Sequence, residues 1–269
     1  VAMILAATGC PTPQFVGAQE QAFHPASHDV GVDLAAIAAV GLRGGYRQFD
    51  RDAIVAAIQS NDVYGPVIAG MRNQVEQLVQ MSDDELRSLI PAASTIRALM
   101  VNTAGCPVHG GGTRVYAPFG IRTDISHPLG VRCPIGGEVY PNENFPDDGS
   151  GWLDERPGSD TQGQRFYFVG WFNHWFLRWL PDKIETMARL WFILDDERYA
   201  HTATVLLERL MEVYPDMDRN DLTYDGSDWG IYVKMLPTMW EGDELVNLVD
   251  GVELMLPLLD DDFLQRFHT

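Results

Sequence analysis

The chain has 269 residues, with 19 Lys and Arg against 38 Asp and Glu, and a formal net charge of −19. Its length fits one large domain or two small ones, and its 46% apolar residues suffice for a sizeable core, which argues against disorder. Because nucleic-acid binding needs clustered Lys and Arg, the acidity excludes nucleic acid as a general partner.

The amino-terminal segment, residues 1–33, is predicted to be a signal remnant or a linker. Its apolar run before Cys10 is too short to span a bilayer, and it resembles the tail of a secretory signal or a bacterial lipoprotein cleavage site. We therefore expect a secreted, periplasmic or lipid-anchored protein with no transmembrane segment. Three cysteines are an odd number and do not form a disulfide framework.

Residues 34–269 are predicted to be mostly α-helical. Apolar residues recur at helical spacing over 67–79, and Ser82 with Glu85 forms the capping-box pattern for a helix at Asp83–Ile90. Further helices are expected over 164–180, 181–194, 198–214 and 241–259, with Pro181 in the first turn of the second of these. Antiparallel helix pairs of this length predict an incomplete α/α toroid.

A long insertion, residues 104–163, interrupts the helical pattern. It is rich in Gly, Pro, Asn and Asp, and short strands are expected at Val115–Tyr116 and Glu138–Tyr140. Irregular stretches of this length inside a compact chain are usually functional. Residues 106–140 carry a net charge of +1, whereas residues 141–269 carry −16, so an anion is repelled least near Arg114, Arg122 and Arg132.

Two similar turns in this insertion contain the candidate metal ligands Cys106, His109 and Cys133. The first turn reads Cys-Pro-Val-His and the second reads Cys-Pro-Ile-Gly, so Gly136 stands where a fourth ligand would complete the pattern. A structural zinc site needs four ligands, of which three are visible. The alternative is a pair of proline-stiffened turns with two buried thiols.

A calcium site is a weaker candidate, because the acidic segment after residue 215 imitates only the start of a calcium loop. Asp221 stands where such a loop requires Gly, and Ser227 stands where it requires a bidentate Glu. A looser cation site, or simply a solvated loop, could be formed by Asp216, Asp218, Asp221, Asp225 and Asp228.

The segment 166–179 is the most unusual, since eight of its fourteen residues are aromatic. Tyr167, Trp171, His174 and Arg178 are three or four residues apart and share one face of a helix. Aromatic faces stack on sugar rings, while Asn, His and Arg bind hydroxyls and carboxylates. The alternative is a helix buried on all sides. The candidate sugar-binding residues are Tyr167, Trp171, Asn173, His174, Arg178, Tyr232, Trp240 and Glu241.

Several motifs follow one another in a characteristic order. They are Met81–Leu86, Leu89–Pro91, Gly105–Gly110, Cys133-Pro134, Pro141–Gly149, Phe172–Trp175, Arg198–Ala200, Val213–Asp218 and Trp240-Glu241. In this order they resemble the heparinase II/III-like family of polysaccharide lyases over about residues 60–260. The chain departs from that family at Gly136, where a second cysteine is often found, and at Leu248–Gly251, where related proteins tend to read Ala-Tyr-Asp.

This resemblance implies an α/α toroid followed by a β-sandwich, with an acidic, uronate-containing polysaccharide bound between them. The implied reaction is β-elimination, in which a base removes the proton at C5 of the uronate and the 4-linked sugar leaves. In the family, the catalytic Asn or His and the Tyr lie after the Trp-Glu motif, and this chain ends about 28 residues after it. We therefore expect a fragment that lacks the β-sandwich, and no catalytic residue is assigned.

Two other classes of function remain open from the sequence. A toroid glycoside hydrolase would use two separated carboxylates, and no acidic pair stands out for that role. A non-catalytic carbohydrate-binding module would need only the aromatic and basic residues.

Overall fold

The computed structural model describes residues 50–96, 105–110, 122–217, 234–235 and 238–268, and this part is mostly helical, as the sequence predicts. The chain divides into a unit of residues 1–41, all outside the described residues, and a unit of residues 42–269. Residues 34–49 of the predicted helical region lie outside the described residues, and so does the strand predicted at Val115–Tyr116.

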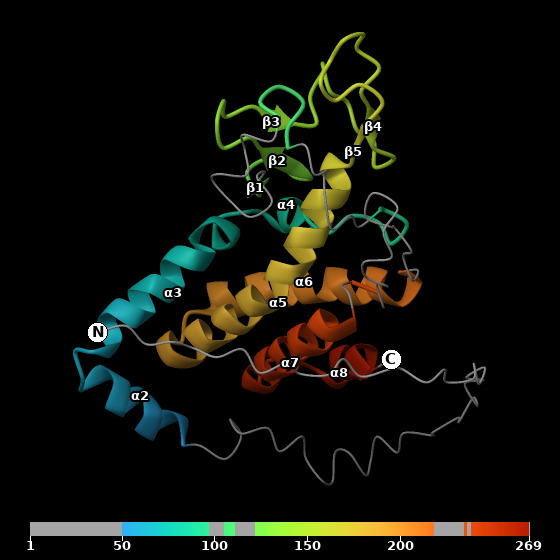
Figure 1. The fold of residues 1–269 in the computed structure, drawn as a ribbon. Coiled ribbons are helices and arrows are strands. Elements are labelled where there is room, and N and C mark those ends of the chain that lie inside the picture. The colour runs from blue at the N-terminus through green and yellow to red at the C-terminus, as the bar shows by residue number, and fades with distance from the viewer. Residues whose placement is uncertain (1–49, 97–104, 111–121, 218–233, 236–237, 269) are drawn as a thin grey trace, which may run out of the picture. The chain divides into compact units, whose positions relative to one another are not determined.

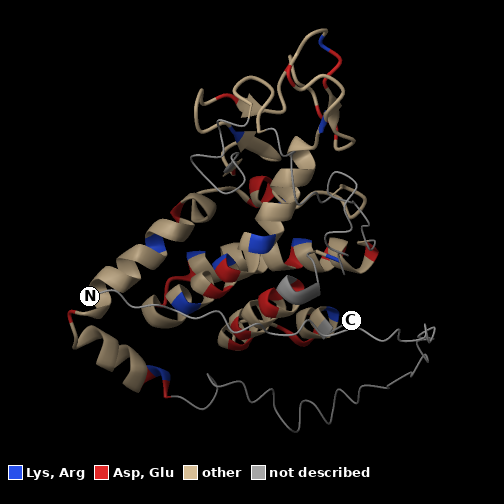
Figure 2. Cartoon of the chain, in the orientation of Figure 1, with Lys and Arg blue, Asp and Glu red and all other residues tan. Residues whose placement is uncertain are grey.

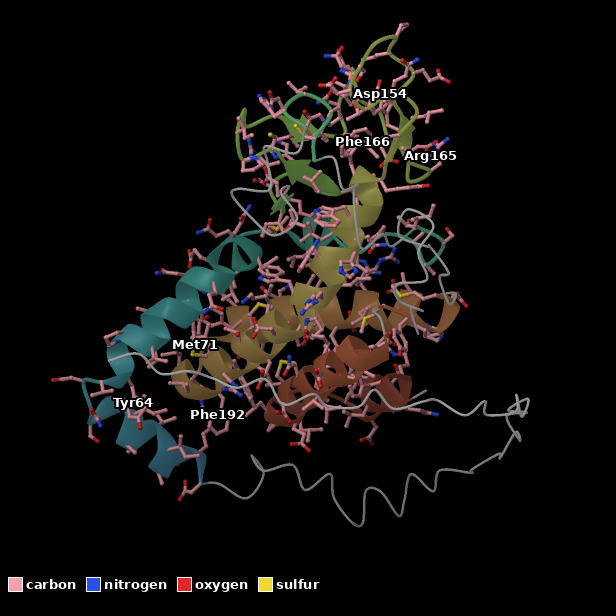
Figure 3. The ribbon with its side chains drawn as sticks, viewed as in Figure 1. Tyr64, Met71, Asp154, Arg165, Phe166 and Phe192 are labelled. Carbon is pink, nitrogen blue, oxygen red and sulfur yellow. The ribbon has the colours of Figure 1, made fainter. Side chains whose placement is uncertain are left out.

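In the described residues that precede the insertion there are three helices: α2 (Arg51–Gln59), α3 (Tyr64–Val79) and α4 (Asp83–Ser88) (Figure 1). The capping box of α4 is confirmed, because the Ser82 hydroxyl accepts a hydrogen bond from the Glu85 backbone and the Glu85 carboxylate accepts one from the Ser82 backbone. The periodicity predicted for α3 buries Val75 and Leu78 completely. Met71, on the same helix, packs against the core from its edge (Figure 3).

Helix α5 (Phe168–Leu194) forms the centre of the core, and it corrects the sequence prediction. Two helices separated at Pro181 were expected, but Pro181 lies inside one continuous helix. A proline in a helix interior removes one backbone hydrogen bond and costs about 3 kcal/mol. Most α5 side chains are buried, Pro181 among them, and this burial outweighs the local cost.

Helix α6 (Glu197–Val213) packs antiparallel to α5 and completes the predicted hairpin. Asp195 makes the turn with a left-handed backbone, at φ 58°, and Asp196 caps α6 by accepting from the Arg198 backbone. A short 3-10 helix (Tyr214–Asp216) follows. The hairpin is therefore local in sequence, as predicted.

Helix α7 (Thr238–Met255) packs against α5, and α8 (Asp261–His268) follows it. One helix over 241–259 was predicted; the structure begins it three residues earlier and ends it at Met255. Gly251 lies at the close approach of α7 to α5, where an added Cβ would be 3.3 Å from the Cα of Glu185. Helix α7 contains five acids and no Lys or Arg (Figure 2).

The insertion is less irregular than predicted, because one small antiparallel sheet lies within it and a strand of it pairs with residues 165–166, where a helix was predicted, in a second sheet. Strands β1 (Arg122–Asp124), β2 (Gly130–Arg132) and β3 (Val139–Tyr140) pair in that order, and the strand predicted at residues 138–140 is confirmed. Strands β4 (Trp152–Leu153) and β5 (Arg165–Phe166) form the second sheet, beside Asp154 (Figure 3). These strands are two or three residues long, too short for a periodic signal in the sequence.

Aromatic side chains join this insertion to the start of α5. The Tyr140 ring stacks on Phe168 with centroids 4.8 Å apart, and the Phe166 ring also stacks on Phe168, with centroids 5.7 Å apart. Phe145 and Trp152 close the cluster edge to face at 4.9 Å. Burial of these rings orients the insertion on the end of α5.

None of the described helices combines the length and the apolar character needed to cross a bilayer.

Candidate functional site

The residues predicted to bind sugar on α5 occupy different environments. Tyr167 precedes the helix as its N-cap residue, while Trp171, Asn173 and His174 are buried at 1%, 1% and 0% exposure. Arg178 alone among the α5 candidates is partly exposed within the helix. The environment of Trp171, Asn173 and His174 is the one expected for the alternative of a buried helix, and their role in sugar binding stays a prediction.

A different face of α5 is accessible to solvent. Trp175, Arg178, Trp179 and Asp182 are each at least partly exposed, and their spacing of three and four residues places them along one stripe. The Arg178 guanidinium lies 5.5 Å from the centroid of the Trp175 ring. Trp175 and Trp179 were present in the aromatic segment but were not singled out, because sequence periodicity does not say which face of an all-apolar helix is covered.

The electrostatics around Arg178 link α5 to α7. Burial is the main cause that raises the pKa of Glu244 on α7, and the charge of Arg178 opposes that change. Burial, followed by the charge of Arg178, lowers the pKa of His174 to about 3. His174 is therefore neutral at neutral pH, when its imidazole can serve in hydrogen bonding but carries no charge for an anionic ligand.

Glu241, predicted to bind sugar, lies in the first turn of α7 and is 2% exposed. Its carboxylate accepts hydrogen bonds from the Tyr214 hydroxyl at 2.8 Å and from the Lys234 backbone at 2.9 Å. These bonds connect α7 to the end of α6. The contacts of Glu241 are those of a residue that stabilises the packing of helices, and its role in sugar binding stays a prediction. Tyr232 and the side chain of Trp240 lie outside the described residues.

The three predicted metal ligands come together in the insertion. Cys106 and Cys133 are buried free thiols, with their sulfur atoms 3.5 Å apart, and His109 Nδ1 lies 3.5 and 3.4 Å from them. Among the described residues, these three are the cluster of His, Cys and acidic side chains arranged as metal ligands. Burial raises the pKa of the Cys133 thiol, opposed by the backbone N–H groups of Gly136 and Ile135.

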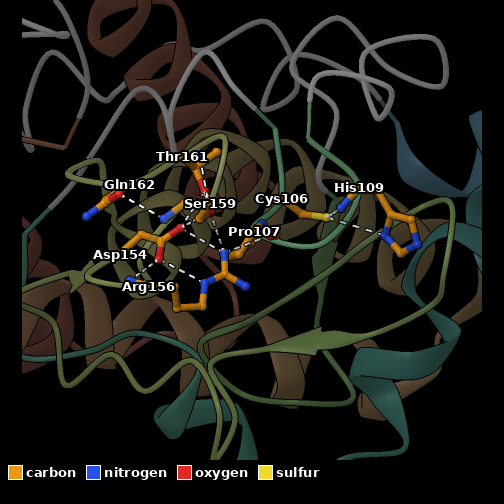
Figure 4. Close-up of polar contacts among 9 residues, drawn as sticks. Cys106, Pro107, His109, Asp154, Arg156, Ser159, Thr161 and Gln162 are labelled. Atoms are coloured by element: carbon orange, nitrogen blue, oxygen red, sulfur yellow. Dashed lines mark hydrogen bonds and ion pairs between the residues drawn. The ribbon is translucent and has the colours of Figure 1, made fainter.

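Beside this cluster lies a polar network that no pattern in the sequence indicates. The carboxylate of Asp154, which is fully buried, accepts hydrogen bonds from Arg156, Ser159 and Thr161 (Figure 4). These bonds, chiefly those from Arg156, lower the pKa of Asp154. Arg156 also donates to the Pro107 carbonyl at 3.0 Å, which ties this loop to the first cysteine turn.

A pocket of about 700 Å³ lies between these two segments, lined by residues 107–110 and 156–161. A second pocket of about 530 Å³ is lined by residues 123–124 and 132–137. Both pockets border the cysteine turns, and neither includes the exposed stripe on α5.

Some of the remaining predicted anion- and cation-binding residues form hydrogen bonds within the chain, and the others lie outside the described residues. Arg132 donates to Asp124 and to the Gly137 carbonyl. Of the five acids in the loose cation site, only Asp216 lies within the described residues, in the 3-10 helix. Arg114 and the side chain of Arg122 are likewise outside them.

Comparisons with protein-family models, with curated proteins and with solved structures found no significant match.

Proposed function

We propose that this chain is the helical part of a polysaccharide lyase-like protein that acts on uronate-containing glycans by β-elimination. In this proposal α5 and α6 form one antiparallel pair of an incomplete α/α toroid. The chain contributes part of the sugar-binding surface, and the base and the acid of the reaction are not assigned to its residues.

The observation that supports sugar binding is the exposed stripe on α5. Trp175 and Trp179 lie one helical turn apart and flank Arg178, so two aromatic rings and one cation reach solvent from the same face. Indole rings stack on the apolar faces of sugars, and a guanidinium binds a carboxylate through two parallel hydrogen bonds. This combination matches a sugar chain that carries a carboxylate.

The reaction class is proposed from the ordered sequence motifs that resemble the heparinase II/III-like family. In β-elimination the uronate carboxylate must be neutralised before the C5 proton becomes acidic enough to be removed. Arg178 is the residue of the stripe suited to contact that carboxylate. Trp175 and Trp179 would stack on the neighbouring sugar rings and hold them in position.

The test is incubation of the chain with alginate, polygalacturonate and heparan sulfate, followed by ultraviolet absorbance of the unsaturated uronate product. New absorbance supports the lyase, whereas new reducing ends without it indicate a hydrolase and overturn the proposed reaction. Binding with neither product indicates a non-catalytic module or a fragment without its catalytic residues. The absence of binding to every polysaccharide contradicts the proposal.

Two variants locate the surface. Arg178→Gln and Trp179→Leu should each weaken polysaccharide binding about tenfold in affinity electrophoresis. The matched control is Arg198→Gln, because Arg198 is exposed on α6 away from the stripe and pairs with Asp196. Equal binding by all three variants would contradict the assignment of this surface.

A further inference from the structure

We propose that Cys106, His109, Cys133 and Glu138 form a tetrahedral zinc site, in which Glu138 supplies the fourth ligand that the Cys-Pro-Ile-Gly turn lacks. This inference is independent of the proposed activity on polysaccharides.

The first three ligands have the separations of a zinc tetrahedron. With Zn–S bonds of about 2.3 Å and Zn–N bonds of about 2.0–2.1 Å, the edges of a tetrahedron are about 3.8 Å between sulfurs and about 3.5 Å between sulfur and nitrogen. The observed separations are 3.5 Å between the sulfurs of Cys106 and Cys133, and 3.5 and 3.4 Å from those sulfurs to His109 Nδ1. A sulfur separation of 3.5 Å is far longer than a disulfide bond of about 2.05 Å.

The carboxylate of Glu138 lies beside His109, outside the group of three ligand atoms that are within 4.8 Å of one another, so its side chain would turn toward the two sulfurs to complete the tetrahedron. Its Oε2 is 3.6 Å from His109 Nδ1, and the edge between a nitrogen and an oxygen ligand is about 3.4 Å. The Oε2 atom is buried and accepts no hydrogen bond within the described part of the chain. A buried carboxylate oxygen without a donor is costly unless a cation balances it.

Gly136 leaves the space beside His109 that the Glu138 carboxylate occupies. A Cβ at residue 136 would overlap both carboxylate oxygens of Glu138 and the Cε1 atom of His109. Because Gly136 has no side chain, the space that a cysteine at this position would occupy is free. The carboxylate of Glu138, two residues later, occupies that space. The departure from the Cys-Pro-x-Cys pattern is a change of ligand.

The backbone supports the ligands in the manner of a metal-binding turn. The His109 N–H donates to the Cys106 sulfur at 3.1 Å, and the Gly110 N–H donates to the Cys106 carbonyl at 2.9 Å. In the second turn, Cys133 and Glu138 are paired by the hydrogen bond from the Cys133 N–H to the Glu138 carbonyl, at 2.8 Å. These bonds fix the directions of the ligating side chains before a metal binds.

The donor set selects zinc and a structural role. Two thiolates and an imidazole favour zinc over calcium or magnesium, which prefer oxygen ligands. Four protein ligands leave no open position for a substrate. The ion would cross-link the loop at 105–110 to the β2–β3 hairpin, in a part of the chain whose strands are too short to be stable alone.

The test uses the full chain, purified without chelator, and measures bound zinc by elemental analysis. One zinc per chain is expected, whereas a chain with reduced thiols and no zinc, even after addition of zinc chloride, would overturn the proposal. A disulfide between Cys106 and Cys133 in the protein purified under reducing conditions would also overturn it.

Glu138 is tested separately by titrating zinc chloride into the chelator-treated chain with a competing chromophoric chelator. Glu138→Gln should weaken zinc binding at least tenfold, and Cys133→Ser should weaken it further, while Glu143→Gln should have no effect because Glu143 is an exposed acid of the same insertion. An affinity unchanged by Glu138→Gln would refute the fourth ligand.

Cobalt provides a readout that does not depend on folding stability. The wild-type chain loaded with Co²⁺ should show the intense visible bands of a four-coordinate ion with thiolate ligands, and Glu138→Gln should shift them. Weak bands typical of six-coordinate cobalt in the wild-type chain would contradict the tetrahedral site.

Discussion

The carboxylate of Glu138 occupies the space that a side chain at residue 136 would fill, because Gly136 has no Cβ. Gly136→Ala should therefore displace Glu138 and His109 and weaken zinc binding at least tenfold in the chelator competition. Gly242→Ala is the matched control, since an added Cβ there meets no atom within 4 Å. Wild-type zinc affinity in Gly136→Ala would show that these side chains have room to adjust.

Two glycines of α7 should respond in opposite directions to the same change. Gly242 faces open space, so Gly242→Ala should raise the free energy of unfolding by about 0.5–1 kcal/mol through the higher helix propensity of alanine. Gly251 lies at the crossing with α5, where the added methyl would press on the Glu185 backbone and the Ile184 side chain at 3.3 Å. Gly251→Ala should lower the free energy of unfolding by about 1–3 kcal/mol.

Urea unfolding followed by circular dichroism measures both glycine variants. The free energy of unfolding should be higher in Gly242→Ala than in Gly251→Ala. If Gly251→Ala were as stable as Gly242→Ala, the close approach of α7 to α5 would not be rigid.

Asp154 should be a major source of stability in the insertion. Asp154→Asn keeps the size of the side chain but weakens the hydrogen bonds from Arg156, Ser159 and Thr161, and hydrogen bonds to a charged group each contribute about 1.5–3 kcal/mol. A loss of at least about 2 kcal/mol is expected in urea unfolding. Asp160→Asn, at an exposed neighbour, should cost less than about 0.5 kcal/mol.

The pH dependence of the Asp154 contribution has a definite sign. Its pKa is lowered in the folded chain, so the unfolded chain binds a proton first as the pH falls. The contribution is complete above the unfolded pKa of about 3.9 and is lost progressively below it. Asp154→Asn should therefore flatten the decline of stability below pH about 4, and an unchanged decline would argue against this role.

His174 should make the helical core sensitive to mild acid. Burial and the charge of Arg178 lower its pKa to about 3, whereas the unfolded value is about 6.5. Between these values the unfolded chain binds a proton that the folded chain does not, so stability falls as the pH falls through this range. From pH 7 to pH 5 the expected loss is about 2 kcal/mol.

The measurement for His174 is urea unfolding at pH 7 and pH 5, with a chelator present throughout so that zinc does not contribute. His174→Gln should reduce the difference between the two pH values, although it lowers stability at both. His201→Gln is the comparison variant, because it replaces a histidine whose side chain is largely exposed. A His174 variant with the full pH dependence would contradict the prediction.

The sequence by itself determined the features that are local along the chain. The capping box at Ser82 and Glu85, the turn between α5 and α6, and the apolar face of α3 each depend on residues within a few positions of one another. The two cysteine turns are also local, so the sequence alone indicates Cys106, His109 and Cys133 as candidate metal ligands.

Only the tertiary structure decided which faces and which distant residues meet. Helix α5 is aromatic on nearly every side, so its accessible stripe of Trp175, Arg178 and Trp179 is set by what α6, α7 and the insertion cover. Pro181 stays inside that helix because long-range burial outweighs a local penalty. Glu138 approaches His109 because the β2–β3 hairpin folds it back over Gly136, a contact that spacing along the chain does not encode.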